Sequence, residues 1–147
     1  MSVALLIGAM ATIAAGAFFP WINGEAVIAA TALVVPRSAL PALVLSCAVV
    51  QMACKACLYG LVRWTPDRLP ARARSMIGRA ERFRERRGLL VVTILSGSLA
   101  AIPPFYLVTL ACGVLRVPLA LFVVAGLGGT IARYGLVAWA VVALGAG

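Results

Sequence analysis

The chain has 147 residues, of which 64% are hydrophobic and only 12% charged, and its formal net charge is +9. A soluble domain is usually about half apolar and about a quarter charged. The composition therefore excludes a disordered chain, a disulfide-stapled secreted module and an ordinary cytosolic enzyme. It predicts a polytopic membrane protein, because so much apolar surface needs lipid as its solvent.

The first apolar run, residues 3–19, ends at a polar break that contains Pro20, Gly24 and Glu25. Proline and glycine this close together interrupt a helix. The next run, 26–35, would rise about 15 Å as a helix, half of a roughly 30 Å hydrocarbon core. The break lies either in an external loop or in a re-entrant hairpin. We favour the hairpin, because a carboxylate in so apolar a region needs shielding by protein or by a water-filled cavity.

A longer apolar run, 38–62, is long enough to span a bilayer with some tilt, and Lys55 lies inside it. It emerges at Arg63 and Trp64, a pair that is typical of a membrane interface.

The stretch 63–88 carries nine arginines against three acidic residues. A basic block between apolar runs predicts a cytoplasmic segment by the positive-inside rule. It reads as an amphipathic helix, with lipid headgroups contacted by Arg63, Arg79, Arg82 and Arg86. A solvated linker helix is the alternative. A nucleic-acid site is not expected, since no recognition fold surrounds these arginines.

The second half of the chain repeats the plan of the first. An apolar run at 89–102 is broken by Pro103 and Pro104, a short run at 105–115 follows, and a long run at 119–144 carries Arg133. The spacing predicts two repeats, at about 3–62 and about 89–147, joined by the 63–88 helix. Halves joined through one cytoplasmic segment favour an inverted pair.

Three ionisable residues fall inside the predicted membrane region: Glu25, Lys55 and Arg133. A charge at the bilayer centre costs about 2.5 to 3.5 kcal/mol on insertion scales, so we expect Glu25 to face Lys55 or Arg133. The alternative is that each long side chain reaches an interface by itself.

The four cysteines lie in apolar segments, at positions 47, 54, 57 and 112, and the chain has no histidine. They suit small-residue packing better than a metal site, although a soft-metal permease remains an alternative. The glycines at 126–129 and at 135 are predicted to let helices approach closely. No metal and no cofactor are expected.

Three stretches share the order of motifs of one known family. The break at 19–25 presents an acid after a Pro-containing turn, Lys55-x-x-x-Tyr59-x-x-x-Arg63 follows, and a second break leads from Pro103 to Arg116. In these features the chain resembles short members of the DedA family, within the SNARE-associated (VTT domain) superfamily of membrane proteins. It departs from the family at Lys55, where many members carry an acid, and after the second break, where their arginine is missing.

The resemblance implies movement of lipids or lipid-phosphate carriers across the membrane. By position, Glu25, Tyr59 and Arg63 match functional residues of the family, and Arg133 matches more loosely. Coupling of transport to protons stays open, because Lys55 stands where many members carry an acid. We expect an all-α integral protein of the bacterial inner membrane, with two inverted repeats that each combine a re-entrant segment and a transmembrane helix.

The expected function is that of a transporter or scramblase for a phospholipid or a polyprenyl-phosphate, with substrate binding or gating by Glu25, Lys55, Arg133 and Tyr59. The protein is not expected to be an enzyme. Its expected partners are membrane lipids and either a second copy of the chain or a larger membrane complex. The alternatives are a non-catalytic accessory subunit and a cysteine-based soft-metal permease.

Overall fold

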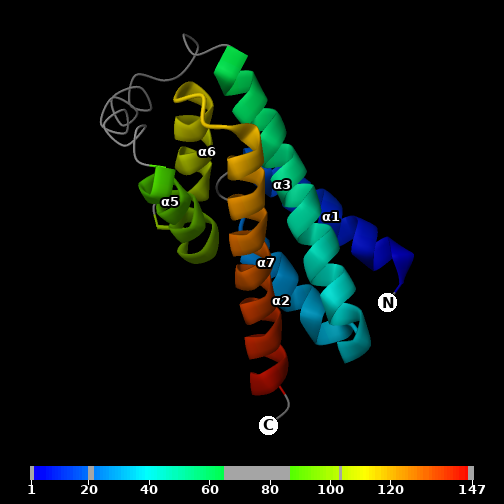
Figure 1. Cartoon of the computed structure of the whole chain (residues 1–147). Helices are drawn as coiled ribbons and strands as arrows, with labels where there is room; N and C mark the ends of the chain where they lie inside the picture. The colour runs from blue at the N-terminus through cyan, green and yellow to red at the C-terminus, as the bar shows by residue number, and fades with distance from the viewer. Residues whose placement is uncertain (1, 20–21, 65–86, 103, 146–147) are drawn as a thin grey trace. The chain divides into compact units, whose positions relative to one another are not determined.

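The computed structural model describes residues 2–19, 22–64, 87–102 and 104–145, and every regular element in these ranges is helical (Figure 1). In chain order the elements are α1 (Val3–Phe18), α2 (Gly24–Val34), the 3-10 helix η1 (Arg37–Ala39), α3 (Leu40–Trp64), α5 (Arg87–Ala100), α6 (Phe105–Val114) and α7 (Leu119–Leu144). The prediction of an all-helical fold is confirmed for these ranges. The predicted basic helix over 63–88 falls almost wholly outside them.

Within the described ranges, two stretches of helix are long and apolar enough to cross a membrane, Arg37–Trp64 and Leu119–Leu144. They contain 28 and 26 residues. At 1.5 Å per residue each rises about 40 Å, more than a roughly 30 Å hydrocarbon core. They correspond to the apolar runs that the sequence predicts as spans.

The other four α-helices of the described ranges are too short to cross by themselves. The longest, α1, has 16 residues and rises only about 24 Å. α1 packs against α2, and α5 packs against α6. Each pair is interrupted where the sequence predicts a break, between Phe18 and Gly24 and between Ala100 and Phe105. Re-entry of these pairs into a membrane remains a prediction.

The end of α6 is fixed by two backbone hydrogen bonds of a Schellman motif. The N–H of Val117 donates to the carbonyl of Cys112 (3.0 Å), and the N–H of Arg116 donates to that of Gly113 (3.2 Å). This motif needs a left-handed residue after the helix, and Arg116 has φ of 52°. The turn therefore places a residue with a Cβ where glycine is usual.

The chain folds into two compact units. Unit 1 consists of Met1–Cys54 and Thr130–Gly147, and unit 2 of Lys55–Gly129. Unit 1 thus contains α1, α2, the first part of α3 and the last part of α7, whereas unit 2 contains the rest of α3, α5, α6 and the start of α7. Each unit combines one pair of short helices with parts of both long helices.

Candidate functional site

Glu25 is held at the start of α2 by the residues just before it. Oδ1 of Asn23 accepts hydrogen bonds from the backbone N–H groups of Glu25 (2.9 Å) and Ala26 (3.4 Å). Asparagine is among the preferred N-cap residues, and an acid in the first turn is favoured by the positive end of the helix dipole. The local sequence therefore both begins α2 and fixes a carboxylate at its N-terminus.

The partner of this carboxylate is Arg133 of α7, in the same unit. Nε of Arg133 lies 2.6 Å from Oε1 of Glu25. The arginine side chain is 16% exposed and the glutamate side chain 39% exposed, so the cation is largely covered while the carboxylate remains accessible. Although the atoms are close, Nε forms no hydrogen bond of good geometry. The contact is an ion pair, and of the two predicted partners it is Arg133, not Lys55, that faces Glu25.

Tyr134 lies beside this ion pair. Its side chain is fully buried, and its hydroxyl has no hydrogen-bond partner in the part of the chain that the structure describes. A Cβ added at Gly24 would lie 2.5 Å from that hydroxyl, so α2 approaches α7 closely only because residue 24 is glycine. We call Gly24, Glu25, Arg133 and Tyr134 the Glu25 cluster. It combines an accessible carboxylate, a covered cation and an unsatisfied hydroxyl.

Lys55 belongs to unit 2 and has a different neighbour. The residue is 4% exposed, and its Nζ lies 5.1 Å from the centroid of the Tyr106 ring. An ammonium over an aromatic face within about 6 Å is a cation–π contact. The predicted gating residues therefore fall into two places, with Glu25 and Arg133 in one unit and Lys55 in the other.

Tyr59, also a predicted gating residue, forms part of a hydrogen-bonded chain in unit 2. Nη1 of Arg63 donates to the Tyr59 hydroxyl (2.6 Å), which donates to the carbonyl of Val117. The Tyr59 ring stacks on Phe122, with centroids 5.3 Å apart. These contacts tie the end of α3 to the turn between α6 and α7, which favours a positioning role for Tyr59.

Lys55 and Arg133 occupy matching positions in the two halves of the sequence. Glu25 is the second residue of α2, and Tyr106 is the second residue of α6. Lys55 and Arg133 are the sixteenth and fifteenth residues of α3 and α7. In each case the second residue of a short helix contacts a cation on the long helix of the other half.

The predicted close packing at glycines holds at some positions and is wrong at others. A Cβ at Gly129 would collide with Oγ of Ser98. Gly113, which is not one of the predicted positions, is also tightly packed, since a Cβ there would lie 2.9 Å from the carbonyl oxygen of Tyr59. Gly128 and Gly135 have nothing within 4 Å of an added Cβ. At Gly135 the missing side chain leaves open space instead of a close helix contact.

Several predicted residues lie outside the described ranges, namely Pro20, Pro103, Arg79, Arg82 and Arg86. Pro104 precedes α6 and offers no side-chain cap to it. Among the described residues no three His, Cys, Asp or Glu side chains come together. Cys47 and Cys112 are buried, Cys54 is intermediate and Cys57 is exposed.

Sequence reasoning missed the contributions of Tyr134 and Tyr106. Neither stands in a recognisable motif, and aromatic residues on apolar helices usually belong to the core. The sequence offers one signal for Tyr134, which directly follows Arg133. Tyr134 lies 79 residues after Lys55, and Arg116 lies 79 residues after Arg37, so Tyr134 aligns with Lys55 when the two halves are aligned on these arginines.

Compared with known proteins, the chain matches no family model, no curated protein and no solved structure. The resemblance to the DedA family therefore remains a prediction from the motifs alone.

Proposed function

We propose that this chain is a multi-pass protein of the bacterial inner membrane that moves a phospholipid or a polyprenyl-phosphate between leaflets. The observation that carries the proposal is the ion pair between Glu25 and Arg133 at the N-terminus of a short helix. Charged residues in apolar helical proteins are costly and usually mark a pathway for an ion or a polar group. Here the cation is largely covered and its carboxylate partner remains accessible.

The proposed chemistry is an exchange of anions on Arg133. A lipid phosphate entering the Glu25 cluster would take the place of the carboxylate, so that the guanidinium is never left without an anion. The phosphate would also meet the N-terminus of α2, where the helix dipole favours negative charge. The Tyr134 hydroxyl, which has no partner among the described residues, supplies one more hydrogen-bonding group.

The proposed architecture is a pair of inverted repeats. It is supported by the order of helix lengths, which is 16, 11 and 25 residues for α1 to α3 and 14, 10 and 26 residues for α5 to α7. The matching contacts of Glu25 with Arg133 and of Tyr106 with Lys55 support it further. Such repeats place substrate sites near the bilayer midplane, next to interrupted helices. In the orientation we propose, the basic stretch 63–88 faces the cytoplasm.

A translocation assay in vesicles tests the proposal. The purified protein is reconstituted with a fluorescent phospholipid, and a membrane-impermeant reductant reports how fast the inner-leaflet label becomes accessible. We expect the wild-type chain to exceed protein-free vesicles and Glu25→Gln to fall to their level. Gln keeps the size of the side chain but cannot neutralise Arg133, and an unpaired Arg133 could itself cause misfolding. The double variant Glu25→Gln with Arg133→Met leaves no unpaired charge, so a loss of translocation that it shares with Glu25→Gln is a loss of transport and not of folding.

The matched control is Arg116→Gln, which removes an exposed cation outside the Glu25 cluster and should leave translocation unchanged. Equal rates for wild type, Glu25→Gln and empty vesicles would refute the proposal. Purification only together with other subunits would favour the accessory role. Metal-dependent transport that is lost when all four cysteines are replaced by serine would favour the soft-metal permease.

A further inference from the structure

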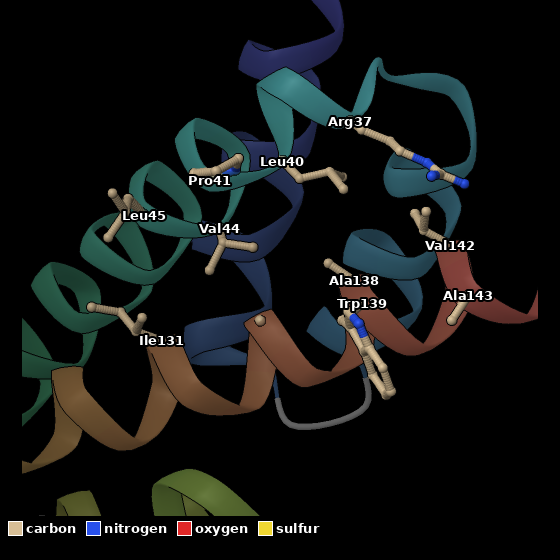
Figure 2. Close-up of a pocket in the computed structure, with 11 residues that line it drawn as sticks. Arg37, Leu40, Pro41, Val44, Leu45, Ile131, Ala138, Trp139, Val142 and Ala143 are labelled. Atoms are coloured by element: carbon tan, nitrogen blue, oxygen red, sulfur yellow. The ribbon is translucent and has the colours of Figure 1, made fainter.

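Unit 1 contains an apolar groove that the Glu25 cluster does not use. It has a volume of about 800 Å³ and runs between the first turns of α3 and the last turns of α7. Its lining includes Leu40, Val44, Ile131, Ala138 and Trp139. In Figure 2, Val44 and Ala138 point into the space between the two helices, Arg37 lies at one end, and Leu45 and Ile131 lie at the other. The ring of Trp139 points away from α3 at the border of the groove.

Small residues on α7 keep this groove open. Gly135 lines it, and a Cβ added there would meet nothing within 4 Å. Ala138 and Ala143 also line the groove, and their small side chains fill little of the space. Trp139 borders the groove with 70% of its surface exposed. A ligand could therefore lie along the groove in contact with the indole.

Among the described residues that line the groove, Arg37 is the only charged one. Glu25 is the one acidic residue in the part of the chain that the structure describes, and it pairs with Arg133. Arg37 consequently has no carboxylate partner there. The groove is thus apolar along its length and cationic at one end (Figure 2).

The length of the groove matches one leaflet of a bilayer. From Ile131 to Ala143, α7 rises about 18 Å, and half of a hydrocarbon core is about 15 Å. Arg37 is the first residue of the helical stretch Arg37–Trp64, so it lies at the end of a candidate span, where a headgroup would be.

A groove of similar character recurs in unit 2. It has a volume of about 740 Å³, is lined by apolar side chains including Leu90, Leu121 and Val124, and has Arg116 as its charged residue. Arg37 and Arg116 are the residues that correspond when the two halves of the sequence are aligned, so the combination of one arginine and an apolar groove occurs twice.

We propose that the groove of unit 1 binds one anionic phospholipid, with an acyl chain along α7 and the phosphate on Arg37. The proposal rests on the membrane location that we propose for the chain, but not on transport. A second copy of the chain fits the groove less well. If the grooves of two copies met, Arg37 of each would find no carboxylate in the lining of the other. A zwitterionic lipid would place its own cation near the same guanidinium.

Trp139 provides a direct readout. Replacing Trp21 and Trp64 by phenylalanine leaves it as the sole tryptophan, and brominated acyl chains quench indole fluorescence on contact. The reporter chain is reconstituted in phosphatidylcholine that contains a small fraction of either brominated phosphatidylglycerol or brominated phosphatidylcholine. We expect the anionic lipid to quench Trp139 more strongly, with an apparent affinity about fivefold higher, as one basic residue near an anionic headgroup provides.

Arg37→Gln should abolish this preference, while Arg116→Gln, in the other unit, should leave it intact. Gly135→Leu should fill the groove and lower quenching by both lipids. Equal quenching by the two lipids, or equal effects of Arg37→Gln and Arg116→Gln, would overturn the proposal. Dimer formation that protects Trp139 from both lipids would assign the groove to a second copy. A chain that keeps the preference but fails to move lipid would refute the proposed transport alone.

Discussion

The contact between Gly24 and Tyr134 allows a quantitative test of how α2 meets α7. A Cβ on residue 24 would lie 2.5 Å from the tyrosine hydroxyl, about 0.9 Å inside the 3.4 Å at which ordinary van der Waals contact begins. Tyr134 is fully buried, so its ring cannot move aside into solvent. We therefore expect Gly24→Ala to destabilise the protein by about 1–3 kcal/mol, the usual cost of overpacking.

Tyr134→Phe should remove this penalty. Without the hydroxyl, the nearest ring atom is Cζ at 3.5 Å from the added Cβ, which is an ordinary contact. By itself, Tyr134→Phe should be neutral or stabilising, because the hydroxyl that it removes is buried and has no partner among the described residues. The double variant should consequently be about as stable as Tyr134→Phe.

The assay is thermal unfolding of the four purified proteins in the same detergent. The matched control is Gly60→Ala in the interior of α3, where an added Cβ meets nothing within 4 Å, so it should not destabilise. Strictly additive effects of Gly24→Ala and Tyr134→Phe would show that the two residues do not meet. A large loss of stability from Tyr134→Phe alone would show that the hydroxyl is hydrogen-bonded, and either result would refute this account of the cluster.

Substitutions at Arg116, Tyr59 and Tyr106 test other parts of the structure in the same unfolding assay. Arg116→Gly should stabilise the chain by about 1 kcal/mol and Arg116→Ala should not, because only glycine relieves the φ of 52°. Tyr59→Phe should cost about 1–3 kcal/mol by leaving the Val117 carbonyl unpaired, whereas Tyr106→Phe should cost little. Position 106 corresponds to position 25, so the carboxylate of Tyr106→Glu should pair with Lys55 as Glu25 pairs with Arg133. The substitution should therefore cost less stability with Lys55 present than in the Lys55→Met background, and equal costs in both backgrounds would contradict the correspondence.

The ends of the helices could be predicted because local chemistry determines them. Proline, glycine and asparagine interrupt the chain between Phe18 and Glu25, and the predicted run at 119–144 coincides with α7. These signals act over a few residues and need no knowledge of the neighbouring helices.

The partner of Glu25 could not be predicted in the same way. Lys55 and Arg133 are single cations at nearly the same distance from the start of their helices, so the sequence favours neither. The choice depends on which long helix lies beside α2, and that is a property of packing. The glycines show the same limit, since Gly129 and Gly135 look alike in sequence although one contacts Ser98 and the other opens a groove.

The pairing across the two halves also bears on how the chain assembles. Glu25 comes from the first half of the sequence and Arg133 from the second, yet both belong to unit 1. Lys55 and Tyr106 are likewise drawn from different halves into unit 2. A half folded alone would leave Glu25 or Arg133 in apolar surroundings without its counter-charge, at a cost of several kcal/mol. The stability of each polar contact thus depends on both halves being present, so the Glu25 cluster is a product of the complete fold and not of the α1–α2 pair alone.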